Sequence, residues 1–202
     1  MALRATSIVP VAAPRSRSMR KRLAFALIVL AGGAQAAQVP INGPTGSRFF
    51  GASVTTLPNG NIVVTDPLFD PDGLGRSFGG AFLYRPDGTL ISSLTGSTPG
   101  DLVAYDGVIV LSNGDYVVKS PFWDNGAVTD AGAITHASGA TGVSGVVTPG
   151  NSLVGGSVDD QVGNGGVTAL PNGNYFVVSS FWNHGVIVDA GAVTFIAVNS
   201  GI

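Results

Sequence analysis

The sequence predicts an all-β protein built from tandem four-stranded antiparallel units. Three observations support this prediction. The first is a gapless repeat, in which Asn172-Gly173 follows Asn113-Gly114 by 59 residues and the surrounding segments correspond. The second is that each copy places an Asn-Gly pair between two β-prone runs, which is a hairpin signal. The third is composition, because the chain has 30 glycines and no glutamate, and no stretch after residue 36 shows helical periodicity.

The repeat defines the predicted domain organisation. Phe122-Trp123 corresponds to Phe181-Trp182, and Asp130-Ala131-Gly132-Ala133 corresponds to Asp189-Ala190-Gly191-Ala192. A more diverged copy lies 54 residues earlier, with Leu57-Pro58-Asn59-Gly60 and Pro67-Leu68-Phe69-Asp70. Repetition over tens of residues means one supersecondary unit copied and stacked. The repeat domain therefore spans residues 37–202, with units at about 48–92, 93–151 and 152–202.

Each unit is expected to contain about four short strands. The first two strands flank the Asn-Gly pair, as in residues 167–170 and 175–178, and Asn-Gly favours a type I′ turn with two positive φ angles. A loop of small and polar residues follows. The third strand is expected at residues 132–136 and 191–196, and the fourth at residues 93–94 and 152–153, leading into the next copy.

The first 36 residues have the pattern of a secretory signal peptide. Arg20-Lys21-Arg22 is a basic region, residues 23–30 are apolar, and Ala34-Gln35-Ala36 is a small-residue cleavage site. Met19 directly precedes the basic residues, which favours it as the true start of translation. The alternative is a short membrane anchor that is not cleaved. We expect an exported protein, at the cell surface, in the periplasm or outside the cell, with no membrane span after cleavage.

The charge of residues 37–202 argues against two classes of partner. Only four basic residues remain there against twelve aspartates, a net charge of −8. No basic patch is left, which excludes nucleic acid and anionic membrane surfaces as expected partners. The chain also contains no cysteine, so the core of an exported domain must be held by burial alone.

Four antiparallel strands per copy are typical of a β-propeller blade, although solenoids are also built from repeats. Residues 37–202 hold about 2.8 units, whereas a closed propeller needs about four to eight blades. The sequence therefore predicts a partial propeller: a fragment of a longer array, a protomer that closes by self-association, or an open stack. In this interpretation residues 39–50 could complete the last unit as its missing strand.

The order of motifs within each copy resembles FG-GAP repeats. The segments that carry the resemblance include Leu153-Val154-Gly155, Val162-Gly163, residues 167–173, Val177-Val178-Ser179-Ser180, Gly191-Ala192-Val193, Ser120-Pro121 and Phe50-Gly51. FG-GAP repeats build the propellers of integrin α-subunits and occur in many bacterial exported proteins. The copies are still more similar to a Trp-Asp-Asn-Gly/Asp-Ala-Gly-Ala repeat of large bacterial surface proteins. The resemblance implies a β-propeller fold over nearly all of residues 48–202.

Catalytic chemistry has little support in the sequence, and we expect no enzyme. The only histidines, His136 and His184, occupy different repeat positions, so they are not one duplicated site. Glutamate, cysteine and a G-x-S-x-G nucleophile motif are absent. Both histidines are interpreted as surface residues.

Calcium is the one cofactor for which the sequence offers candidates. Clustered carboxylates on Gly-containing loops suit this ion, and the candidates are Asp66, Asp70, Asp72, Asp124, Asp130 and Asp189. The calcium loop of FG-GAP repeats lies in the hairpin before the second strand, where this chain has only short turns, so that family's ligands do not carry over. Aspartates also cap turns by accepting hydrogen bonds from nearby amides, and this second interpretation is favoured.

The recurring aromatic pairs are the candidate ligand-binding residues. Phe122, Trp123, Phe181 and Trp182 follow the second strand of their units. An exposed tryptophan suits a sugar ring or a protein surface, whereas identical placement in successive copies also suits packing between units.

The sequence as a whole predicts a non-enzymatic exported module for adhesion, ligand binding or surface display. Its binding surface would be formed by the loops at residues 66–78, 122–131 and 181–190, with a protein or carbohydrate as ligand. The alternatives are a calcium-stabilised structural fragment and, less favoured, a hydrolase or lyase that uses the propeller's loop face. Further repeats or self-association would complete the stack.

Overall fold

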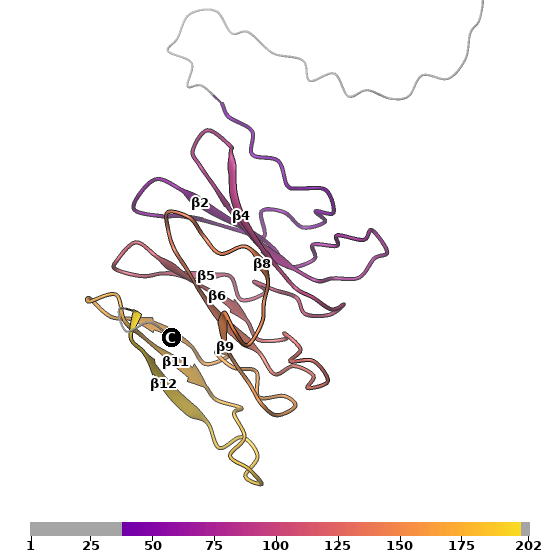
Figure 1. Ribbon diagram of the computed structural model, residues 1–202, viewed down its shortest axis with the longest axis vertical. Helices are drawn as coiled ribbons and strands as arrows, with labels where there is room; N and C mark the ends of the chain where they lie inside the picture. The colour runs from indigo at the N-terminus through magenta and orange to yellow at the C-terminus, as the bar shows by residue number, and fades with distance from the viewer. Residues whose placement is uncertain (1–37, 199–202) are drawn as a thin grey trace, which may run out of the picture. The chain divides into compact units, whose positions relative to one another are not determined.

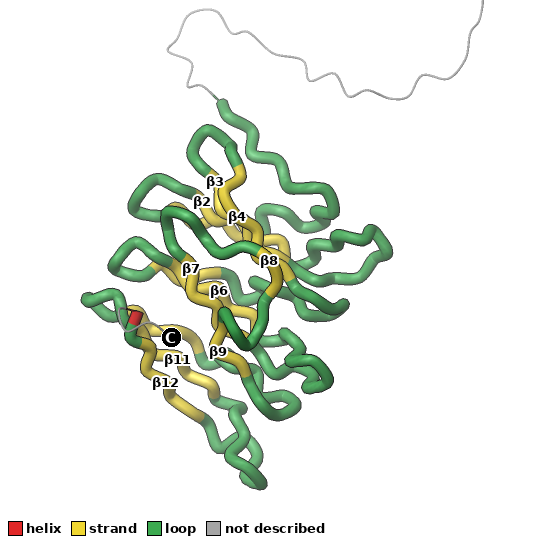
Figure 2. The backbone as a smooth tube through the Cα atoms, in the orientation of Figure 1, coloured by secondary structure: helices red, strands yellow, loops and turns green. Residues whose placement is uncertain are grey.

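The computed structural model describes residues 38–198, and the predicted signal segment lies outside this range. The described chain is all-β, as predicted, and contains no α-helix (Figures 1 and 2). It forms three sheets, one for each sequence unit. The strands of each sheet are neighbours along the chain, apart from the short strand β8.

The first sheet has the strand order β1-β2-β3-β4-β8. Its first four strands form an antiparallel meander, and β8 joins β4 in the parallel sense. The bounds are β1 Ser53–Thr56, β2 Ile62–Asp66, β3 Gly80–Tyr84, β4 Leu90–Thr95 and β8 Gly145–Val146. Because β4 pairs with β3, the fourth strand completes the sheet of its own unit.

The second and third sheets repeat the meander. The second has the order β5-β6-β7-β9, with β5 Val108–Val110, β6 Tyr116–Ser120, β7 Ala133–Ala137 and β9 Ser152–Val154. The third has the order β10-β11-β12, with β10 Gly166–Ala169, β11 Tyr175–Ser179 and β12 Ala192–Ile196. The third sheet has no counterpart of β4 or β9 within residues 38–198. The four predicted strands per unit are therefore confirmed for the first two units, and the last unit has three.

The hairpin turns differ from the predicted type I′. In each unit the glycine alone has a positive φ, near 90° (Gly60, Gly114 and Gly173), and the preceding asparagine does not. The Gly60 amide donates to the Leu57 carbonyl, and the Leu57 amide donates to the Asn61 carbonyl. This is a type I turn followed by a glycine bulge. In the first and third units a proline at the second turn position fixes a negative φ, which suits type I.

Apolar layers join each sheet to the next. The first layer includes Val63 and Leu83 of the first sheet together with Tyr116 and Val118 of the second. The next layer combines Val117 and Ile134 of the second sheet with Tyr175 and Val177 of the third. Successive residues of β6 thus face opposite layers, as strand alternation requires. The repeat therefore stacks by burying both faces of its middle sheet.

The N-terminal segment covers the outer face of the first sheet. Ile41 and Phe50 pack against a cluster of buried residues that includes Phe82 and Tyr84, and the rings of Phe50 and Tyr84 meet edge to face at 5.9 Å. The Tyr84 hydroxyl donates to the Asn42 carbonyl at 3.2 Å. The expectation that residues 39–50 complete the last unit is therefore wrong, because their apolar side chains are used to cover the first.

Candidate functional site

Three equivalent loops follow the second strand of each hairpin. They are residues 66–78, 122–131 and 181–190, which we call the loop row. In the last two units the loop tip closes on itself through paired backbone hydrogen bonds between Asn125 and Val128, and between His184 and Ile187. The third loop exposes apolar side chains at its tip, with Val186 98% exposed and Val188 73% exposed. The loop row is the most apolar exposed feature that the sequence analysis singled out.

A buried aspartate ties the second loop to the segment before it. Asp101 is fully buried, and its carboxylate accepts hydrogen bonds from the amides of Ser97 and Thr98 at 2.7 and 2.9 Å and from the Thr98 hydroxyl at 2.5 Å. The other bond crosses into the loop row, where the Asp124 amide donates to Asp101 Oδ1 at 3.2 Å. Several donors on one carboxylate hold the loop without a metal ion.

The same arrangement recurs 59 residues later. Asp160, also buried, accepts from the amides of Gly156 and Ser157 at 2.9 and 2.8 Å. The amide and the side-chain Nδ2 of Asn183 both donate to Asp160 Oδ1, at 2.9 and 3.0 Å. We call Asp101 and Asp160 the loop clasps. Sequence reasoning missed both, although their shared position five residues after a glycine (Gly96 and Gly155) was a usable repeat signal.

The four candidate aromatic residues lie in different environments. Trp123 is 3% exposed and belongs to the layer between the first two sheets, so it offers no face to a ligand. Phe122 is half-buried against Tyr105, edge to face at 5.0 Å. Trp182 is half-buried beside His184, with ring centroids 5.6 Å apart. Of the four, only Phe181, 46% exposed, is open to a partner.

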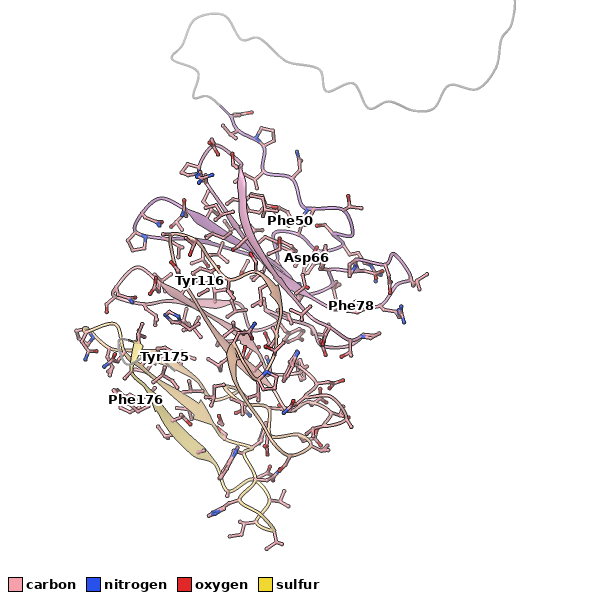
Figure 3. All side chains as sticks on the ribbon, viewed as in Figure 1. Phe50, Asp66, Phe78, Tyr116, Tyr175 and Phe176 are labelled. Atoms are coloured by element: carbon pink, nitrogen blue, oxygen red, sulfur yellow. The ribbon has the colours of Figure 1, made fainter. Side chains whose placement is uncertain are left out.

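The candidate metal ligands of the first unit accept hydrogen bonds from backbone amides. Buried Asp66 accepts from the amides of Arg48 and Phe49, both at 2.9 Å, and Figure 3 shows this aspartate within the first sheet. Buried Asp70 accepts from the Gly75 amide at 2.7 Å. Asp72 accepts from the Leu74 amide, which, helped by Arg76, lowers the pKa of its carboxyl. These bonds are the predicted turn chemistry.

The candidate ligands of the later units also serve the backbone of the loop row. Asp124 Oδ1 accepts from the Asp130 amide at 2.9 Å, and the equivalent bond runs from the Asp189 amide to Asn183 Oδ1 at 3.0 Å. Partial burial, and then the charges of Asp124 and Asp159, raise the pKa of Asp130. Across residues 38–198, no three His or Asp side chains gather to hold a metal ion.

A cavity of about 330 Å³ lies between the second and third sheets. His136 and Tyr175 line it, and their rings stack at 6.3 Å with 5° between their planes. His136 Nε2 lies 3.4 Å from Asp115 Oδ2. The cavity is also lined by Ser152, whose hydroxyl is hydrogen-bonded to Thr135 and Asn151. The arrangement therefore pairs a histidine with an aspartate, and the serine hydroxyl is bonded elsewhere.

Comparison with known proteins identifies a repeat and no more. Residues 110–164 and 169–202 match the model of a repeat of unknown function (DUF5650). The two matches begin 59 residues apart, which agrees with the period read from the sequence. A search of curated proteins found no match. The matches show a repeat protein and carry no support for the FG-GAP resemblance.

One structural observation bears on the membrane. Within residues 38–198, no helix is long and apolar enough to cross a bilayer.

Proposed function

We propose that the protein is a non-enzymatic repeat module that binds a macromolecular ligand through the loop row. The observation that carries this proposal is the pair of loop clasps. Asp101 and Asp160 fix the second and third loops by backbone hydrogen bonds, so these loops are pre-organised before a ligand arrives. Pre-organisation lowers the entropic cost of binding.

The third loop supplies the contact chemistry in this proposal. Phe181, Val186, Ile187 and Val188 are all exposed, and an exposed apolar group on a rigid loop favours a protein surface or a sugar ring as partner. The predicted signal segment supports export, and a role in adhesion or surface display of a bacterial type follows from it. We interpret the three stacked sheets as blades of a partial, FG-GAP-like β-propeller.

The binding proposal is tested on immobilised glycans and immobilised proteins. We expect binding by the unaltered chain and a loss of at least tenfold in affinity for the double variant Phe181→Ser/Ile187→Ser. Val54, in β1, is 63% exposed outside the loop row, so Val54→Ser is the matched control and should bind normally. Equal loss in both variants, or no binding across the panel, contradicts the proposal.

A calcium-stabilised structural role is the second candidate, and one observation favours it. Asp70 Oδ1 and Ser47 Oγ are buried and have no hydrogen-bond partner, and both residues line a hollow of about 350 Å³. Against this role, Arg48 Nη1 lies 3.9 Å from Asp70 Oδ2. A guanidinium this close already neutralises part of the carboxylate charge that an ion would need.

A further inference from the structure

The last strand of the third sheet has a free edge that its counterpart lacks. In the second sheet, β7 pairs with β6 on one side and with β9 on the other, antiparallel in both cases. β12 occupies the same position in the repeat and pairs only with β11 within residues 38–198 (Figure 1). The outer edge of β12 is thus a position where this repeat otherwise holds an antiparallel strand.

Nothing in the sequence of β12 protects that edge. Natural proteins block free edges with charged residues, proline or bulges, whereas β12 reads Ala-Val-Thr-Phe-Ile with no charge and no proline. The strand is long enough for five residue pairs. An unprotected apolar edge of this length is a template for another strand.

The outward face of the third sheet is apolar as well. Val193 is 68% exposed and Phe195 is 51% exposed, and the Phe195 ring lies 5.2 Å from that of Phe176. Figure 3 shows Phe176 next to Tyr175, the residue before it in β11 that belongs to the layer between the second and third sheets. The second-sheet counterparts of Phe176 and Val193 are Val117 and Ile134, which the third sheet buries.

These observations restrict what a second copy of the chain could offer. The outer face of its first sheet is already covered by Ile41 and Phe50, and both faces of its middle sheet are buried in the two apolar layers. What remains is its own β12, with the same free edge. Two identical edges meet around a two-fold axis, which gives a closed dimer.

We propose that β12 pairs antiparallel with β12 of a second copy, with Thr194 on the two-fold axis. In this register Val193 lies opposite the partner's Phe195, and Thr194 lies opposite the partner's Thr194. β-branched–aromatic pairs and Thr–Thr pairs are both favourable across antiparallel strands. The two three-stranded sheets join into one six-stranded sheet, and the partner's β12 takes the place that β9 has beside β7.

The first test measures mass by light scattering during size-exclusion chromatography of the purified chain. We expect the mass of two chains for the unaltered protein and of one chain for Val193→Lys/Phe195→Lys, in which lysines face each other across the axis. Val193→Lys/Phe195→Glu places opposite charges in the same pairs and should restore the dimer, weakened by salt. A monomeric unaltered chain, or monomers for both variants, overturns the proposed register.

The second test uses the absence of cysteine from the chain. Thr194→Cys should form an intermolecular disulfide on mild oxidation, because the two thiols meet at the axis. Ala192→Cys is the matched control and should not, since residue 192 lies opposite the partner's residue 196. Equal cross-linking of the two variants, or cross-linking of Ala192→Cys alone, contradicts the proposed pairing.

Discussion

Asp160 accepts a hydrogen bond from the backbone amide of Asn183 at 2.9 Å, across 23 residues of chain. Its counterpart Asp101 has the same relationship with Asp124. The bond joins the segment that leads into one sheet to the loop that leaves the second strand of that sheet. The repeat therefore carries its own fastening between a connecting segment and the loop row.

Removing a loop clasp should be costly. Asp101→Ala leaves the amides of Ser97, Thr98 and Asp124 without their acceptor in a buried site, so we expect a loss of about 3 kcal/mol in the free energy of unfolding. Urea denaturation measures the loss. Asp87, exposed and bonded to the Thr89 amide, is the control, and Asp87→Ala should be much milder; equal effects of the two changes contradict the assigned role of Asp101.

Two equivalent glycines should respond differently to alanine. A Cβ at Gly132 would lie 2.2 Å from the Val162 amide nitrogen, whereas at Gly191 the nearest atom is 3.6 Å away, and both residues have φ near +75°. Gly191→Ala should therefore cost only the left-handed strain, about 1–2 kcal/mol. Gly132→Ala adds a backbone clash and should cost clearly more in chemical denaturation. Comparable losses would show that the connecting segment yields easily.

The two tryptophans should separate by stability. Trp123 is buried between the first two sheets, so Trp123→Ala should cost about 3–5 kcal/mol. Phe181 is exposed, and Phe181→Ala should leave the melting temperature nearly unchanged. Trp182, half-buried at the edge of its layer, should give an intermediate loss on change to alanine. A ranking by thermal melts in any other order contradicts the burial assigned to these side chains.

The ionised Asp130 carboxylate should destabilise the fold at neutral pH. Burial, and then two neighbouring carboxylates, raise the pKa of this group in the folded protein, which means that folding disfavours its charged form. The penalty is complete above the raised pKa and disappears as the pH falls below the ordinary aspartate value. The change Asp130→Asn should therefore stabilise the fold at neutral pH and have no effect at low pH.

The control for this pH dependence is the equivalent change Asp189→Asn. The Asp189 amide donates its loop bond to neutral Asn183 in place of an aspartate, so the repulsion from that carboxylate is missing. Asparagine tolerates the positive φ of 49° at residue 130 and of 52° at residue 189. Unfolding measurements from acid to neutral pH distinguish the two, and an equal gain in both variants would exclude Asp124 as a cause.

Calcium should leave the melting temperature unchanged under the binding-module proposal. The candidate carboxylates accept hydrogen bonds from backbone amides or hold loop amides, and an ion that binds only the native state must raise its stability. Thermal melts with millimolar calcium and with chelator measure this. A rise that is abolished by Asp70→Asn would favour the calcium-stabilised role.

Much of the fold could be predicted because the repeat displays its own grammar. Asn113-Gly114 and Asn172-Gly173 marked the hairpins, and the 59-residue period marked the strands on either side. The turn type was wrong, since proline and the glycine bulge decided it. The candidate site was predicted only in part: the loops were identified, but Asp101 and Asp160 were missed because a buried cap and an exposed turn aspartate look alike in sequence.

The sequence by itself determined the all-β class, the period and the number of strands in each unit, because hairpin turns and strand alternation are local properties. Only the tertiary structure decided what each copy does with them. Gly132 and Gly191 have the same local sequence, yet a following segment packs on one and not on the other. Burial depends on the neighbouring unit, and so do the loop clasps and the free edge of β12.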